Sequence, residues 1–143
     1  IRNLANKLKI DAWHFGINFL KEEISRCEEL GIKYFDFCMY PNALHDKPRY
    51  EFYIEPLYDV VNISDEQLCE AIRKYIYKEN SLLWYECVSF KNLDEPLAYF
   101  LQPQTFNLHR DLRIMKGATA SQIKPIKVIK DEKILNFFKM FVR

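Results

Sequence analysis

The chain is poor in glycine and in long apolar runs, and it lacks the usual catalytic sequence motifs. It has 3 Gly among 143 residues, with no phosphate-binding glycine loop, dinucleotide fingerprint, His-Glu-x-x-His or Gly-x-Ser-x-Gly. These absences nearly exclude phosphate binding by a backbone loop. They also argue against the enzyme classes that carry these motifs. Because no apolar run approaches the roughly 18 residues of a bilayer span and no signal segment opens the chain, we expect a soluble protein with no membrane partner.

Closely spaced cysteines are also missing. Cys27, Cys38, Cys69 and Cys87 are widely separated, and no Cys-x-x-Cys pair occurs. This spacing does not suit a zinc site or a redox dithiol, so we expect no metal site. The simpler interpretation is that the cysteines are free thiols that pack as small apolar side chains. Free thiols persist in a reducing compartment, so this interpretation predicts a cytoplasmic protein.

The composition is that of a globular protein, with 49% hydrophobic and 29% charged residues. A chain of this length predicts one domain over residues 1–143. The first residue is Ile rather than Met, which indicates a piece of something longer. The net charge of +1 hides two poles, because residues 1–104 carry 12 basic and 17 acidic residues and residues 105–143 carry 9 and 3. A basic C-terminal quarter suits either phosphate binding or salt bridges with a protein, and both interpretations stay open.

Hydrophobic periodicity predicts an α+β fold, with a mixed or antiparallel sheet of four to five strands and helices mainly on one face. The expected helices cover residues 11–31, residues 64–78 after the capping box Ser64-Asp65-Glu66-Gln67, and a terminal segment from Asp131 that buries Ile134, Leu135, Phe138 and Phe141. The expected strands are 32–39, 50–55 with a possible extension over 57–61, a central strand at 81–90 and an edge strand at 123–129. A helical turn is expected between Pro96 and Pro103.

Acidic residues on the predicted strands are the candidates for catalysis. Two-metal nucleotidyl transfer needs acids close enough to share two cations, and Asp36, Glu51 and Glu86 from neighbouring strands could supply them. Glu51 and Glu55 share one face of a strand but stand about 13 Å apart, too far for one metal pair. Acids scattered over solvated faces are the commoner arrangement, so a non-enzymatic protein without a cofactor is favoured. Mg²⁺ is expected only if the chain is a nucleotidyl transferase.

A basic segment late in the chain carries a sequence pattern. It runs Asn-Leu-His-Arg-Asp-Leu-Arg-Ile-Met-Lys-Gly-Ala-Thr over residues 107–119 and continues with Lys-Pro-Ile-Lys-Val at residues 124–128. Two arginines at the spacing of Arg110 and Arg113 can address phosphates with bidentate contacts, and lysines add attraction to a nucleic-acid backbone. The segment resembles the last block of the archaeo-eukaryotic primase and primase-polymerase superfamily, in which an Arg-x-x-Arg step leads into a Pro-Gly-Thr turn and a Lys…Pro-Val strand.

The resemblance implies that Arg110 and Arg113 bind a nucleotide or template. The turn proline is replaced by the step from Met115 to Lys116, and Asp36 has no paired aspartate, so a non-catalytic relative or accessory subunit is implied. Exposed rings beside the predicted strands could stack unpaired bases. The nucleic-acid hypothesis therefore names His109, Arg110, Arg113, Lys116, Lys124, Lys127, Tyr53 and Tyr85 as binding residues.

These patterns leave two hypotheses of different classes. The first is a small intracellular module that binds single-stranded nucleic acid or a nucleotide and serves DNA replication. The second is a non-enzymatic protein-interaction domain, of the inhibitor, immunity or adaptor kind, that uses its acidic and basic poles within a larger complex.

Overall fold

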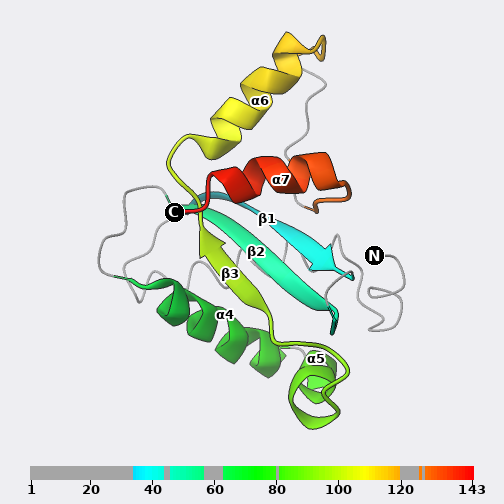
Figure 1. Cartoon of the computed structure of the whole chain (residues 1–143). Helices are drawn as coiled ribbons and strands as arrows, with labels where there is room; N and C mark the ends of the chain where they lie inside the picture. Colours follow the sequence, from blue (N-terminus) through cyan, green and yellow to red (C-terminus); the bar gives the residue numbers. More distant parts are fainter. Residues whose placement is uncertain (1–33, 44–45, 57–62, 80, 120–125, 127) are drawn as a thin grey trace.

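A computed structural model describes residues 34–43, 46–56, 63–79, 81–119, 126 and 128–143 of the chain (Figure 1). The helix expected at 11–31 and the strand extension expected at 57–61 lie outside these residues. No helix in the described part is long and apolar enough to cross a membrane.

The described part is an α+β fold built on a mixed sheet, as expected. Its strands are β1 (Tyr34–Asn42), β2 (Arg49–Pro56) and β3 (Leu97–Phe100), in the order β1-β2-β3. β1 pairs with β2 antiparallel, and β2 pairs with β3 parallel. The sheet of the described residues therefore has three strands, fewer than the four to five expected.

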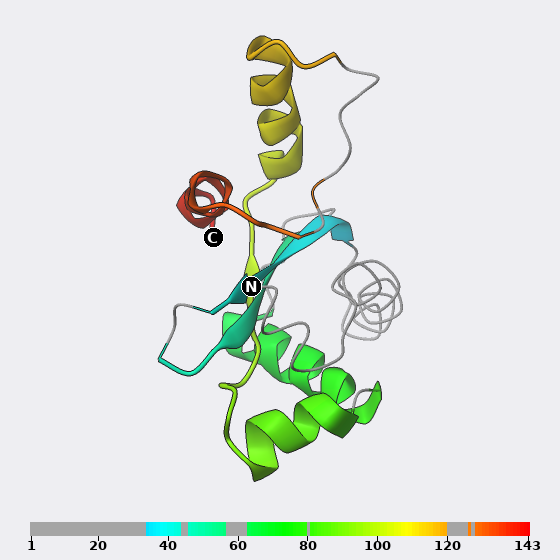
Figure 2. The same ribbon diagram turned by 90° about the vertical axis from the view of Figure 1, so that its right-hand side faces the viewer.

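Helices lie on both faces of this sheet, whereas mainly one covered face was expected. They are α4 (Asp65–Glu79), α5 (Ser81–Trp84), the π-helix η3 (Tyr85–Ser89), α6 (Thr105–Met115) and α7 (Glu132–Met140). α4 and α5 lie on one side of the sheet and α7 on the other, while α6 extends away from it (Figures 1 and 2).

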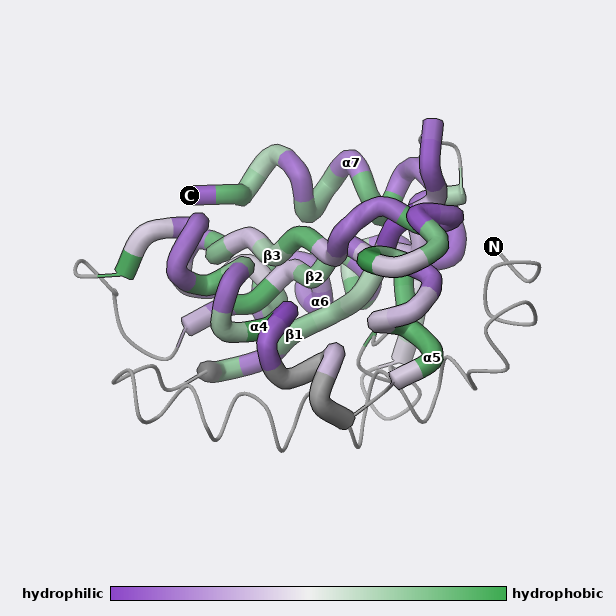
Figure 3. The backbone as a smooth tube through the Cα atoms, turned by 90° about the horizontal axis from the view of Figure 1, so that it is seen from below, coloured by the Kyte–Doolittle hydropathy of each residue, from purple (hydrophilic) through white to green (hydrophobic). Residues whose placement is uncertain are grey.

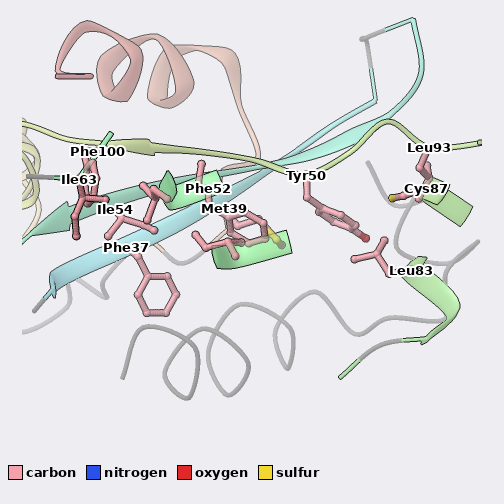
Figure 4. Packing of buried hydrophobic residues seen from close by; sticks show 13 residues of the cluster. Phe37, Met39, Tyr50, Phe52, Ile54, Ile63, Leu83, Cys87, Leu93 and Phe100 are labelled. Carbon is pink, nitrogen blue, oxygen red and sulfur yellow. The ribbon is translucent and has the colours of Figure 1, made fainter. Parts of the chain in front are cut away.

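The larger core cluster fills the space between the sheet and α4. Side chains from all three strands meet those of α4, α5 and η3 there (Figure 4). The buried members are Phe37, Met39, Tyr50, Phe52, Ile54, Ile63, Leu68, Ile72, Leu83, Cys87, Leu93, Ala98 and Phe100. Burial of this much apolar surface is the main favourable contribution to folding.

A second core cluster lies on the α7 face. It joins the alternate strand residues to the first turn of α6 and the inner side of α7. The buried members are Cys38, Tyr40, Tyr53, Leu101, Phe106, Ile129, Leu135 and Phe138. Because the clusters cover opposite faces, β2 is buried from Tyr50 to Pro56, although alternation alone predicts a half-buried strand.

The expected second and terminal helices are confirmed as α4 and α7. The capping box forms as the sequence predicts: the Gln67 N–H donates to Ser64 Oγ at 3.1 Å, and the Ser64 N–H donates to Gln67 Oε1 at 3.0 Å. Asp131 caps α7 by accepting from the Ile134 N–H at 2.9 Å. Hydrophilic and hydrophobic residues alternate along α7 (Figure 3), as an amphipathic helix requires.

The central strand expected at 81–90 is wrong, because this segment forms α5 and η3. Leu83 and Cys87, four residues apart, are its buried side chains, while Trp84, Tyr85 and Val88 are exposed. This is the spacing of one helical face. Aromatic content favoured a strand in the sequence, but the burial pattern has a helical period.

The helical turn expected between Pro96 and Pro103 is also wrong, because β3 occupies this segment. Ala98 and Phe100 are buried and pair with β2 in parallel. Four residues carry too little periodicity to distinguish a turn from a strand, so pairing with the buried β2 decides the outcome.

The edge strand expected at 123–129 lies mostly outside the described residues. Within them, Val128 makes an isolated parallel bridge to Met39, and the Ile129 N–H donates to the Met39 carbonyl at 2.8 Å. Cys69 and Cys87 are free thiols, as expected, and burial raises the pKa of Cys87 to about 11. Cys87 is therefore an inert core residue rather than a nucleophile.

We predict that Phe52→Ala destabilises the fold by about 3–5 kcal/mol, because it leaves a cavity beneath the central strand. Phe90→Ala is the matched control, since the Phe90 side chain is 65% exposed and that of Phe52 is 0% exposed. Urea unfolding followed by far-UV circular dichroism measures both variants. Equal losses in the two would contradict the assignment of the core.

Candidate functional site: the polar residues beneath α7 and α6

Alternation along β2 places three polar side chains on the α7 face of the sheet. These are Glu51, Tyr53 and Glu55, and each is at most 2% exposed. Buried carboxylates are rare unless protein groups satisfy them. The partners of these residues therefore define the main polar site of the described structure.

Three donors hold the Glu51 carboxylate at one end of the site. Arg49 Nε donates to Glu51 Oε2 at 2.8 Å, and Asn42 Nδ2 donates to the same oxygen at 3.0 Å. The Tyr53 hydroxyl donates to Glu51 Oε1 at 3.2 Å. We call these residues the Glu51 cluster. Both carboxylate oxygens are satisfied, so the cluster is a structural ion pair with a fixed geometry.

Tyrosines surround the Glu51 cluster. The rings of Tyr53 and Tyr99 stack with centroids 5.4 Å apart. Burial raises the pKa of Tyr53, and the neighbouring Glu51 carboxylate raises it further. Tyr99 and Tyr40 have pKa values raised by the same two causes, in the same order. All three hydroxyls therefore act as neutral groups, and Tyr53 is a donor rather than a base.

Glu55 occupies the other end of the site, beside the first turn of α6. Its Oε1 accepts from the Phe106 N–H at 2.8 Å, 51 positions along the chain. Burial raises the pKa of Glu55, while the backbone N–H groups of Phe106, Gln104 and Thr105 lower it and Asp36 raises it. The carboxylate thus caps α6 from a neighbouring strand, a task that residues beside a helix usually perform.

The structure does not bring Asp36, Glu51 and Glu86 together. Asp36 lies opposite Glu55 in the sheet register, whereas Glu51 lies opposite Tyr40. Glu86 is on η3, beyond the far end of the sheet, where it accepts from Asn92 Nδ2 at 3.1 Å. Among the residues that the structure describes, no three His, Cys, Asp or Glu side chains are grouped to hold a metal ion.

Four of the expected binding residues lie on α6 or directly after it. His109 packs on Phe137 and Phe138 of α7, with ring centroids 5.1 and 5.3 Å away. Burial lowers the pKa of His109, and the neighbouring charges of Arg113 and Lys116 lower it further. Arg110 and Lys116 are exposed and Arg113 is partly buried. Lys124 and Lys127 lie outside the described residues.

The structure does not bring the two tyrosines expected to stack bases together on one surface. Tyr53 is buried under α7 and has no free face for a base. Tyr85 is 47% exposed, but it lies on η3, and α6 projects from the opposite end of the molecule (Figures 1 and 2). There Tyr85 contacts Trp84 and Phe90, with ring centroids 5.0 and 6.1 Å away.

Comparison with known families decides the assignment. The model of the GH3 family C-terminal domain matches residues 18–133, most of the chain. The chain belongs to this family. The match covers the sheet, α4, α5, η3, α6 and the start of α7, so the GH3 C-terminal domain contains the whole polar site beneath α7 and α6.

Solved structures agree with this fold. The GH3.15 acyl acid amido synthetase superposes with a TM-score of 0.71 at 15% identity, over 86% of this chain and 21% of that one. A structure titled AtGH3.15 acyl acid amido synthetase in complex with 2,4-DB gives a TM-score of 0.70 at 14% identity, over 90% and 23%. At such identities the likeness shows the fold alone. The chain spans about a fifth of the length of these relatives.

One curated protein shares a short segment with the chain. It is described as probable endonuclease 4 of Mesoplasma florum and is 48% identical over 33 residues, which cover 23% of this chain and 11% of that protein. So short a match shows no family.

The resemblance to the primase superfamily is wrong. The GH3 family match includes the entire segment 110–128 that carried it. Arg110 and Arg113 lie within one helix rather than on a step into a turn and strand. The hypotheses of a replication accessory module, of a single-stranded nucleic-acid or nucleotide partner and of a non-enzymatic interaction domain are overturned by the same finding. A basic segment indicates a charged surface, and charge alone does not name its partner.

Sequence reasoning missed the role of Glu55. Alternation in residues 50–55 already places Glu55 on one face with Glu51 and Tyr53. No local pattern connects Glu55 with Phe106, because the contact spans 51 residues and depends on how α6 leaves the sheet.

We predict that Arg49→Met lowers the free energy of unfolding by about 1–3 kcal/mol, because it removes the charged donor to a buried carboxylate. The double variant Arg49→Met with Glu51→Gln is expected to recover part of this loss, since no buried charge is then left without its cation. Urea unfolding measures the double-mutant cycle. Strictly additive losses would contradict the coupling.

His109 is expected to make the fold less stable in mild acid. The folded state lowers the pKa of His109 below its usual value of 6.5, so the unfolded chain binds the proton first. Stability is therefore lost as the pH falls through 6.5 toward the lower folded-state pKa. Chemical denaturation of the wild type and His109→Gln from pH 7.5 to 5 tests this, and identical pH slopes in the two proteins would refute it.

Proposed function

We propose that this chain is the C-terminal domain of an acyl acid amido synthetase, an enzyme that joins an acyl acid to an amine through an amide bond. The observation that carries the proposal is the GH3 family match over residues 18–133. The superposition on two acyl acid amido synthetase structures supports it.

In this proposal the buried acids of the domain are structural, and the domain forms only part of the enzyme's reaction centre. The Glu51 carboxylate is saturated by protein donors, and Glu55 is used at the root of α6. Since the chain spans about a fifth of its solved relatives, the groups that hold the acyl acid belong largely to the rest of the enzyme.

A carboxylate does not condense with an amine in water without activation, so the enzyme needs an energy-rich co-substrate. We choose ATP as the co-substrate with which to test this requirement.

The test uses the full protein as it occurs naturally, with ATP and Mg²⁺, a panel of aryl and alkyl carboxylic acids, and hydroxylamine as the amine. We expect a hydroxamate whose formation depends on both the acid and ATP. The matched control omits the acid. Absence of hydroxamate, and of amide when amino acids replace hydroxylamine, would refute the proposal.

We also propose a cytoplasmic location. The free thiols of Cys69 and Cys87 support it, because such thiols persist in a reducing compartment. Immunoblotting of cell fractions tests this, and recovery in a secreted or lumenal fraction would contradict it.

A further inference from the structure

α6 is attached to the rest of the domain mainly through its first turn. Thr105 and Phe106 are its buried residues, whereas the remaining side chains of the helix are exposed or only partly buried. Both views show the helix extending away from the sheet (Figures 1 and 2). Contacts at the first turn, together with the packing of His109 on the α7 rings, therefore decide the direction in which α6 points.

The chain enters α6 through a backbone conformation that needs support. Gln104 has φ 70°, in the left-handed region that non-glycine residues seldom adopt. Thr105 Oγ1 donates to the Gln102 carbonyl at 2.6 Å, and the Gln102 N–H donates to the Phe141 carbonyl at 2.8 Å. Neighbouring groups must hold such a turn in place, because the turn does not favour its own geometry.

The Glu55 carboxylate is the acceptor that reaches this turn from the centre of the sheet. It bonds the Phe106 N–H, and the N–H groups of Gln104 and Thr105 also face it. A carboxylate at a helix N-terminus satisfies free amides and interacts favourably with the helix dipole. Both effects are stronger for the ionised carboxylate than for the neutral acid.

We propose that ionised Glu55 anchors α6 to β2 and that protonation of Glu55 loosens this anchor, so that the attachment of α6 is linked to pH. This inference does not rest on the proposed enzymatic function. It concerns a conformational device within the fold, and it holds or fails independently of whether the enzyme forms amides.

Two opposing influences set the proton affinity of the anchor. Burial and the facing Asp36 carboxylate on β1 favour the protonated acid, and the three α6 amides favour the ionised form. Phe138 of α7 contributes an apolar ring on Phe106. Burial outweighs the amides, so the pKa of Glu55 lies above its usual value. The amides are the part of this balance that α6 supplies, so for a Glu55 that stays buried beneath α7 a proton weakens the docking of α6.

His109, farther along α6, is a second titrating group and must be separated from Glu55. It faces Arg113 on its own helix, Lys116 directly after that helix and Asp131 before α7. Its contacts are with the α7 rings rather than with β2. Variants of Glu55 therefore isolate the anchor from the histidine.

The experiment is amide hydrogen exchange of the whole chain, corrected for the intrinsic pH dependence of exchange, from pH 7.5 to 4.5. Residues 107–115 of α6 are compared with residues 50–55 of β2. We expect α6 to lose about fivefold in protection toward acid, the size typical of losing one N-terminal cap, while β2 stays protected. Equal protection of α6 across this range would overturn the proposal.

Glu55→Gln keeps an acceptor oxygen but cannot ionise. In this variant α6 is expected to exchange faster than the wild type at pH 7.5 and to lose the acid-dependent step. Glu70→Gln, which changes an exposed acid on α4, is the matched control and is expected to keep the wild-type response. A wild-type acid response in Glu55→Gln would overturn the proposal.

Asp36→Asn provides a variant with a different prediction, and it keeps the test decisive if Glu55→Gln fails to fold. Removing the facing carboxylate lowers the pKa of Glu55, so the loss of α6 protection is expected to move to lower pH. An unchanged midpoint, or a shift to higher pH, would count against Glu55 as the titrating group.

Discussion

The burial of β2 on both faces is the constraint on which the rest of the structure depends. A strand between β1 and β3 has its backbone groups paired, so its side chains decide what packs above and below the sheet. Phe52 and Ile54 draw α4 and the α5–η3 segment to one face. Tyr53 meets the cluster that α7 and the first turn of α6 complete on the other.

Acidic residues on a strand that is buried on both faces need hydrogen-bond donors, and the surrounding elements supply them. Glu51 is satisfied by Arg49, two residues earlier on β2, and by Asn42 at the end of β1, which the strand pairing brings into reach. Glu55 has no such partner nearby, and the amides at the start of α6 fill that role. The same requirement thus produces a rigid ion pair at one end of the strand and a helix attachment at the other.

Elements whose information is local were predictable. The capping box at Ser64 and the cap at Asp131 each define a helix start. The aromatic-rich run of β1 and the alternation in β2 are enough to predict two strands. Residues 81–90 were predicted as a strand and form helices, whereas residues 97–100 were predicted as a helical turn and form a strand. Short apolar runs suit either conformation until packing against a neighbouring element selects one. Glu51, one of the candidate acids, is a buried carboxylate held by Arg49 and Asn42, and the burial that makes these donors necessary is a tertiary property. The late basic pattern was informative about surface charge and misleading about its family.

The sequence by itself determined the α+β class, the two capped helices and the alternation that puts Glu51, Tyr53 and Glu55 on one face, because these follow from hydrogen bonds and periodicities within a few residues. Only the tertiary structure decided that this face is buried, that Asn42 of β1 joins Arg49 on the Glu51 carboxylate, and that Glu55 holds a helix 51 positions away. The physical reason is that the cost of burying a charge, and the donor that offsets it, exist only once distant segments have excluded water together.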